Sequence, residues 1–400
     1  MTTPVPARPD APSAPASDTT ADLLAHPIAF DAIPRAAWDR LFAATALATP
    51  FSAWTMHRAW WDAYAATAHE QYLAVTARGD HPADPDALRG IVPFMHRHEV
   101  EPTDAATHTA LRGGHAEGTH VDPDAKAVFF GASYHADYAT ILADPSDLDA
   151  VADAAVETLA GPPDASHGTE EWDVVDLRRL RDGDPALGAL ERAFRRRATS
   201  EGWQVHLEQE DVCPVLTFED GDFEAYLSTL DKKARHEIRR KIRRAEAAST
   251  LTFQLLPPTS ETVDAFIELH QRRWGSEGLF PETEGGTRSR RFLHRVAELA
   301  AADGPTRTTA QFGLLSLDGT PVFSTVGFDD GHTCYFYNAG MDPAARELSP
   351  GVTGTAAYLR DRLEAGRRRF DFLRGDEPYK YEWGAVDEPI HRLLVTRITD

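Results

Sequence analysis

Cysteine is scarce in this chain. Only Cys213 and Cys334 occur among the 400 residues, and neither belongs to a CxxC pair or to a Cys/His cluster. A cysteine-based zinc site or a disulfide framework needs more thiols at closer spacing. We therefore expect no metal cofactor, no disulfide and a reducing, cytoplasmic location.

Long apolar runs are also absent. No stretch approaches the roughly 18 uncharged apolar residues that a membrane helix requires. The first 25 residues are rich in Ala, Pro, Thr and Ser and lack the apolar core of a signal peptide. We expect a disordered tail over residues 1–27 and no membrane insertion.

Basic residues are outnumbered, with 41 Lys and Arg against 63 Asp and Glu and a net charge of −22. Because phosphate contacts need a positive field, this balance disfavours DNA binding. The helix predicted over residues 231–248 is a local exception, since Ile238, Ile242 and Ala245 form its apolar stripe and the rest is densely basic. This basic face is either a solvated surface or an electrostatic binding surface for a polyanion such as a nucleotide-linked sugar, coenzyme A or a tRNA acceptor end.

Several familiar catalytic signatures are missing. The chain has no Gly-x-Ser-x-Gly elbow, HExxH helix, Walker loop or dinucleotide fingerprint. Hydrolase, metalloprotease, NTPase and Rossmann dehydrogenase functions therefore lose support.

What the chain does contain is a polar segment over residues 370–384, FDFLRGDEPYKYEWG. Phe370 and Phe372 alternate as in a half-buried strand, and residues 374–376 then break the pattern. Open α/β sheets usually bind ligands just beyond the C-terminal ends of their strands. Asp371, between the two phenylalanines, is expected to face the opposite side of the sheet, where it needs a partner.

This segment supplies the groups that acylation of an amine requires. Asp376 and Glu377 are candidate bases for the attacking nitrogen, and Tyr379 is a candidate acid for the leaving group. Arg374 and Lys380 are candidates for binding a carboxylate or phosphate of a substrate. The alternative is a surface ion-pair network around a tight turn.

Together with Leu348-Ser349-Pro350-Gly351 and the basic helix, the segment resembles the bacterial acyltransferase family of the GNAT superfamily that includes CelD-like polysaccharide-biosynthesis proteins. More distantly, it is similar to Fem-type aminoacyl transferases. The resemblance extends from about Pro50 to the C-terminus. It implies a mixed-sheet α/β fold of the GNAT (acyl-CoA N-acyltransferase) type in two tandem units, because Fem-type enzymes contain two.

The pattern of elements agrees with a duplicated unit. Strands are predicted over 88–96, 128–142, 172–177, 204–207 and 212–218, and helices over 148–159 and 186–200. The second half is predicted to contain a hairpin of 310–317 and 321–328 around Asp318-Gly319, strands over 333–339, 369–373 and 391–398, and a helix over 351–365. Because the chain is too long for one typical core, we predict an N-terminal unit over 28–220 and a C-terminal acyltransferase domain over 221–400. Their boundary falls near 219–222, where Asp222 can cap the next helix.

The resemblance also implies a donor site. In the GNAT fold, N–H groups of a loop and of the following helix N-terminus hold the pyrophosphate of coenzyme A. Arg346, Ser349 and Gly351 fall on the key positions of the family loop R/Q-x-x-G-x-G/A, with serine in place of the first glycine. The alternative is an ordinary helix start, with Ser349 as N-cap and Pro350 at the first helical position.

One tryptophan and one aspartate are further candidates for the site. Trp274 in the second half and Asp137 at the end of a first-half strand are candidate substrate-binding residues. Trp54, Trp60 and Trp61 either line a cleft or belong to the core, since tryptophans at helical spacing are more often core.

These patterns, together with what the resemblance implies, predict a cytoplasmic, metal-independent N-acyltransferase that uses acyl-CoA, such as acetyl-CoA. The expected acceptor is an amine on a small molecule such as an amino sugar, or on a cell-envelope precursor. No activated nucleophile is evident, so we expect direct transfer. Two alternatives stay open, an aminoacyl-tRNA-dependent Fem-like transferase and a non-catalytic binding protein that retains the fold.

Overall fold

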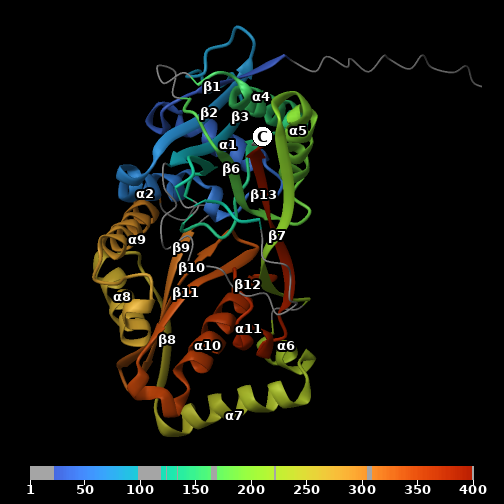
Figure 1. Ribbon diagram of the computed structural model, residues 1–400. Coiled ribbons are helices and arrows are strands. Elements are labelled where there is room, and N and C mark those ends of the chain that lie inside the picture. Colours follow the sequence, from blue (N-terminus) through green and yellow to red (C-terminus); the bar gives the residue numbers. More distant parts are fainter. Residues whose placement is uncertain are drawn as a thin grey trace, which may run out of the picture.

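A computed structural model describes residues 22–97, 119–122, 124–132, 134–163, 169–219, 222–303 and 309–398 (Figure 1). Residues 1–21 of the predicted tail and residues 220–221 at the predicted boundary lie outside the described residues. The last residues assigned to the tail instead form strand β1 (Leu23–Pro27), which pairs antiparallel with β2 (His69–Ala77).

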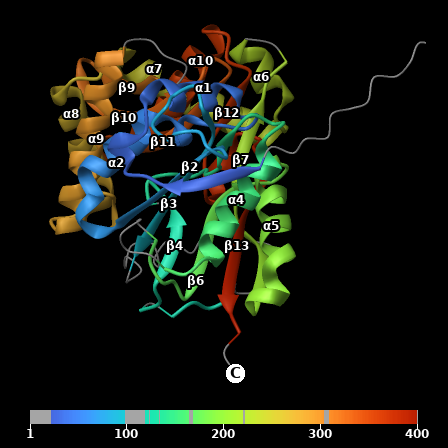
Figure 2. The ribbon, with the colours of Figure 1, turned by 90° about the horizontal axis from the view of Figure 1, so that it is seen from above.

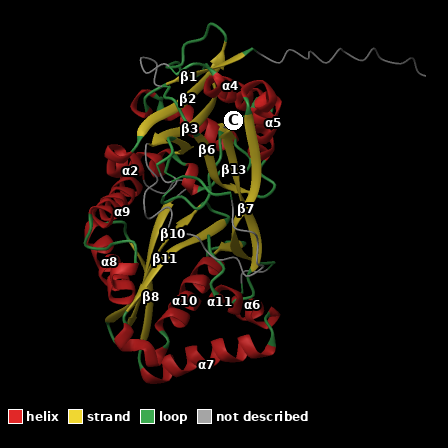
Figure 3. Cartoon of the chain, viewed as in Figure 1, coloured by secondary structure: helices red, strands yellow, loops and turns green. Residues whose placement is uncertain are grey.

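The strands of the described residues form one continuous mixed sheet, shown in yellow in Figure 3. Its order is β1-β2-β3-β4-β6-β13-β7-β12-β11-β10-β9-β8, with β5 against β3. The remaining strands are β3 (Leu88–Arg97), β4 (Ala127–Phe130), β5 (Leu142–Ala143), β6 (Val174–Arg181), β7 (Trp203–Thr217), β8 (Leu251–Leu256), β9 (Thr309–Leu317), β10 (Thr320–Asp329), β11 (Thr333–Met341), β12 (Arg369–Asp371) and β13 (Val386–Arg397).

Helices cover the sheet, and their apolar faces form its cores. They are α1 (Arg35–Ala44), α2 (Trp54–Tyr64), α4 (Leu148–Ala160), α5 (Pro185–Glu201), α6 (Phe223–Thr229), α7 (Lys232–Ala248), α8 (Ser260–Trp274), α9 (Glu284–Asp303), α10 (Pro350–Glu364) and α11 (Pro378–Glu382). Figure 2 shows α4 and α5 beside β6 and β13, and residues of these elements share one core. Residues of α6, α7 and α10 share another, and α2, α8 and α9 contribute to a third. No described helix is long and apolar enough to cross a bilayer.

The two halves of the chain repeat one arrangement, as the element pattern predicts. In each half, three strands pair antiparallel in chain order. A helix then crosses over, and the fourth strand pairs parallel with the third. The series is β2-β3-β4-α4-β6 in the first half and β9-β10-β11-α10-β12 in the second. The two halves are joined through β7, which pairs with both β12 and β13. The C-terminal strand β13 thus lies between β6 and β7, so the sheet crosses the boundary predicted near residues 219–222.

The basic helix follows its sequence signals closely. Helix α7 begins at Lys232, and Asp231 caps it by accepting hydrogen bonds from the N–H groups of Lys233 and Ala234. Asp222 caps α6 in the same way. Each cap occurs where an acidic residue precedes the helix, as N-cap preferences require.

The prediction of one strand over residues 128–142 is wrong for the centre of that range. Among the described residues of this range, only those of β4 (Ala127–Phe130) and β5 (Leu142–Ala143) form strands. Ala132 has a φ of 62°, and its carbonyl accepts from the N–H groups of His135 and Ala136, so the chain turns there. The two short strands predicted over 204–207 and 212–218 are, by contrast, one strand, β7.

Candidate functional site

The site lies where two parallel strands of the second half separate. The pairing of β11 with β12 covers only the positions from Thr333↔Arg369 to Tyr335↔Asp371. Strand β11 continues to Met341, whereas β12 ends at Asp371. The second part of β11, including Tyr337, and the segment after β12 therefore line opposite sides of an opening, which holds a cavity of about 590 Å³.

This cavity gathers most of the residues that the sequence analysis proposes. Its lining includes Arg346, Ser349, Gly351, Trp274, Asp137, Arg374, Glu377, Tyr379 and Lys380. Asp376 is buried and does not belong to the lining. The chemical roles assigned to these residues stay predictions.

The predicted donor loop leads into α10, and its backbone explains the family pattern. Ser349 has φ 53° and ψ 55°, a left-handed conformation that costs a non-glycine residue about 1–2 kcal/mol. Its hydroxyl does not cap α10 but accepts a 2.7 Å hydrogen bond from Arg244 of α7. A Cβ at Gly351 would lie 2.6 Å from the Met341 side chain, so glycine leaves room at the helix start.

The basic helix borders the same loop. Lys241 of α7 lines the cavity, and Arg244 contacts Ser349 as described. Ile238 and Ala245 are buried, as the predicted apolar stripe requires. Within the described part of the chain, Arg346 and Arg243 are exposed and form no ion pair. The loop is therefore surrounded by positive charge on the side of α7.

Lys380 holds the loop that follows β12. Its side chain is 2% exposed, and its ammonium donates hydrogen bonds to the carbonyls of Leu373 (2.9 Å), Arg374 (2.8 Å) and Gly375 (2.9 Å). It also lies 2.9 Å from a carboxylate oxygen of Glu377. Leu373, with a φ of 60°, gives this loop a strained backbone, whereas Gly375, with a φ of 107°, adopts a conformation that glycine allows. The protein itself occupies the donors of Lys380, so its geometry favours loop positioning over the predicted substrate contact.

We expect Lys380→Met to destabilise the protein by about 2–4 kcal/mol, because buried carbonyls lose their donor. Guanidinium unfolding followed by circular dichroism measures this change. The matched control is Lys126→Met, which removes an exposed ion pair with Glu171 and is expected to cost no more than about 1 kcal/mol. Equal costs for the two variants would contradict the positioning role.

Tyr379 and Glu377 lie on the open side of the loop. The Tyr379 residue is 39% exposed, but the pKa of its hydroxyl is raised above the ordinary value by burial and, secondarily, by the Glu377 carboxylate. The cation of Arg273 opposes this shift, and its guanidinium lies 4.5 Å from the ring centroid of Trp274. Tyr379 therefore keeps its proton at neutral pH, as an acid must.

Contacts from the first half complete the wall of the cavity. Asp137 lies 3.3 Å from the guanidinium of Arg374, with both side chains largely buried. Burial acts to lower the pKa of Arg374, but Asp137 and neighbouring carboxylates raise it overall. Asp371, which the sequence analysis expects to need a partner, accepts a 2.8 Å hydrogen bond from the hydroxyl of Tyr138. Both halves therefore fix the segment after β12.

The sequence analysis misses His135, which lies at the junction of the halves. Its ring nitrogens are 2.8 Å from the hydroxyls of Tyr64 and Tyr337, and the ring stacks on Phe292. Burial, with a smaller contribution from Arg179, lowers the pKa of His135 to about 3, so the ring is neutral. His135 and Tyr337 both line the cavity. No local pattern indicates this contact, because its partners come from distant segments.

The first-half tryptophans belong to the core. Trp60 is fully buried, and Trp54 and Trp61 pack against core clusters. None of the three lines the cavity. Their helical spacing therefore reflects packing of α2.

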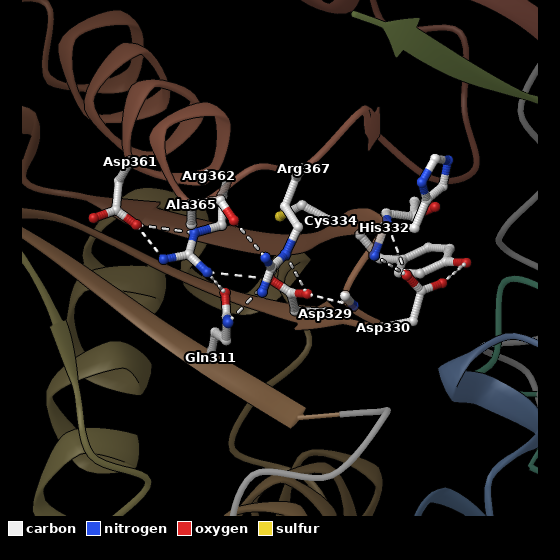
Figure 4. Close-up of polar contacts among 12 residues, drawn as sticks. Gln311, Asp329, Asp330, His332, Cys334, Asp361, Arg362, Ala365 and Arg367 are labelled. Atoms are coloured by element: carbon white, nitrogen blue, oxygen red, sulfur yellow. Dashed lines mark hydrogen bonds and ion pairs between the residues drawn. The ribbon is translucent and has the colours of Figure 1, made fainter. Parts of the chain in front are cut away.

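A buried ion network anchors the other end of α10 (Figure 4). Asp329, at the end of β10, accepts hydrogen bonds from Arg362 of α10 (3.1 Å) and from Arg367 (2.7 and 2.8 Å). Gln311 donates to Asp329 and accepts from Arg362. Asp361 pairs with Arg362 from the solvent side. This network fixes the crossover whose opposite end presents the donor loop.

Comparisons with known proteins agree with this architecture. Residues 232–381 match the family described as "Acetyltransferase (GNAT) domain". Among solved structures, a conserved protein of unknown function from Bacteroides thetaiotaomicron VPI-5482 has 13% identity and a TM-score of 0.52, over 91% of this chain and 98% of that one. FemX has 10% identity and a TM-score of 0.54, over 90% and 96%. No curated protein gives a significant match. The chain thus has the GNAT-like mixed α/β fold, and residues 232–381, with the donor loop and the segment after β12, match a GNAT domain.

Proposed function

We propose that this protein is an N-acyltransferase that moves an acyl group from an acyl-CoA thioester to an amine. The observation that carries the proposal is a single cavity of about 590 Å³ lined by the donor loop, by the segment after β12 and by first-half residues. Donor and acceptor can therefore meet in one place, as direct transfer requires. The match of residues 232–381 to a GNAT acetyltransferase domain supports the same class of reaction.

The residues at the donor loop fit a pyrophosphate. The N-terminus of α10 carries the positive end of its dipole, and Gly351 brings its backbone close to the end of the Met341 side chain in the lining. Arg346 and Lys241 line the cavity beside it and supply cations. The expected ligand is the diphosphate of coenzyme A, which would place the thioester inside the cavity.

The proposed chemistry uses Glu377 and Tyr379. The amine nitrogen attacks the thioester carbonyl while Glu377 accepts its proton, directly or through one water. The C–S bond then breaks, and the Tyr379 hydroxyl donates its proton to the leaving sulfur. Arg374, paired with Asp137, lies in the lining where it can bind an anionic group of the acceptor. Acceptors of this kind include amino sugars and cell-envelope precursors.

Calorimetric titration with acetyl-CoA and longer acyl-CoA thioesters tests the donor site. We expect micromolar binding, and we expect the Arg346→Ala/Gly351→Asp double variant to lose at least about 2.7 kcal/mol, a hundredfold in Kd. The physical reason is the loss of one cation and the addition of a carboxylate and a steric clash at the helix start. The matched control is Arg195→Ala, which changes an exposed arginine of α5 outside the lining. Unchanged binding by the double variant would remove the donor loop from the proposal.

An aminoacyl-tRNA donor is the second candidate, and the basic helix favours it. Helix α7 presents exposed cations beside the cavity, and Lys241 reaches the lining. This alternative predicts tRNA binding that weakens steeply with salt and with charge reversal at Arg239, Arg240 and Arg243. Filter binding at several salt concentrations measures it. Absent or salt-independent tRNA binding would eliminate this candidate.

A further inference from the structure

A group of metal-ligating side chains in the first half lies outside the cavity described above. His69 of β2 and His96 of β3 are directly opposed in the antiparallel register. Glu170 contacts both, with one oxygen 2.5 Å from Nδ1 of His69 and the other 3.4 Å from Nδ1 of His96. The three ligand atoms lie within 4.8 Å of one another. We propose that His69, His96 and Glu170 form a divalent-cation site suited to Zn²⁺.

The orientation of His96 supports this proposal. Its Nε2 lies 3.0 Å from the carbonyl oxygen of Glu171, and because a carbonyl only accepts, Nε2 carries the proton. In the neutral ring, Nδ1 then presents a lone pair toward the Glu170 carboxylate, which is also an acceptor. A divalent cation between them would accept a lone pair from each. A backbone carbonyl that accepts from the other ring nitrogen commonly orients a metal-bound histidine.

The donor set and its exposure also suit zinc. Two imidazole nitrogens and a carboxylate oxygen are ligands that Zn²⁺ accepts at about 2.0–2.2 Å, with a fourth position left for water. The His96 side chain is 1% exposed, and that of His69 is 55% exposed. One ligand is thus fixed in the interior, while the site is reachable from solvent. Bound metal would link Glu170 to the β2–β3 hairpin.

Zinc titration of the full chain tests the site. The protein is dialysed against EDTA, returned to chelator-free buffer and titrated with ZnCl₂ by calorimetry. We expect one site per chain whose affinity falls at least about tenfold in His69→Ala and in Glu170→Gln, since each removes a ligand. The matched control is His332→Ala, which removes an exposed histidine outside the cluster and is expected to bind as the wild type does.

Thermal unfolding with and without zinc provides a second readout. Because zinc that binds only the folded state stabilises it, we expect ZnCl₂ to raise the Tm of the wild type and of His332→Ala, but not that of His69→Ala. His69 is exposed, so this variant is expected to fold. Absence of saturable zinc binding by the wild type would overturn the proposal and leave His96 and Glu170 as an ion pair. Equal zinc affinity in the wild type and His69→Ala would overturn it as well.

Discussion

Tyr379→Phe is expected to lower kcat for acyl transfer by about 10²–10⁴-fold, the usual contribution of a general acid. The substitution removes the hydroxyl that would protonate the leaving thiolate and keeps the ring that packs edge-on to Phe372. KM for the donor is expected to change little, because the hydroxyl would act in the transition state. Steady-state assays of thiol release with acetyl-CoA and an accepted amine measure both parameters.

Tyr381→Phe is the matched control for this experiment. Tyr381 also belongs to α11, but its hydroxyl donates to Asp387 and it does not line the cavity. Its kcat is expected to stay near that of the wild type. A Tyr379→Phe variant with full kcat would contradict the acid role.

The base is tested by the same assay. We expect a larger loss of kcat for Glu377→Gln than for Asp376→Asn, because of these two residues only Glu377 lines the cavity. Full rates in both would refute a base in this segment.

Asp329→Ala is expected to destabilise the protein by about 3–5 kcal/mol, since it removes one partner of a buried ion network. Asp329 is 3% exposed and Arg362 is 6% exposed, so the guanidinium would lose its buried counter-ion. Arg367 would lose its carboxylate partner as well. Urea unfolding followed by circular dichroism measures the change in the free energy of unfolding.

Asp361→Ala is the control for the network. Asp361 pairs with the same Arg362, but its side chain is 38% exposed. A partly exposed pair contributes only about 0–1 kcal/mol, so the cost is expected to be small. If Asp329→Ala cost no more than Asp361→Ala, the network would not anchor α10.

Local signals predict those parts of the fold in which neighbours along the chain decide the conformation. Asp318-Gly319 predicts a two-residue hairpin, and the φ values of 49° and 82° there are those of a type I′ turn. Asp222 is predicted to cap the next helix and does cap α6, because a side-chain cap acts within three residues. The order of helices and strands can be predicted for the same reason, because neighbours along the chain decide it.

Long-range contacts explain what the sequence does not reveal. The apolar pattern of residues 128–142 reads as a strand, but the chain turns at Ala132 and places His135 against Tyr337, 202 positions away. The sequence predicts Lys380 as a substrate-binding cation. It does not show that the Lys380 ammonium donates to three backbone carbonyls of the protein itself. Ser349 occupies the expected helix start, but its backbone is left-handed and its hydroxyl accepts from Arg244 of α7, a residue 105 positions away, instead of capping α10.

A crystal structure of the protein with acetyl-CoA tests the central claim most directly. We expect the pyrophosphate at the N-terminus of α10, within hydrogen-bond distance of the Gly351 N–H, and the thioester sulfur within reach of the Tyr379 hydroxyl. Coenzyme A bound elsewhere on the molecule, or a cavity that stays empty at saturating donor, would contradict the proposed acyl-CoA-dependent transfer.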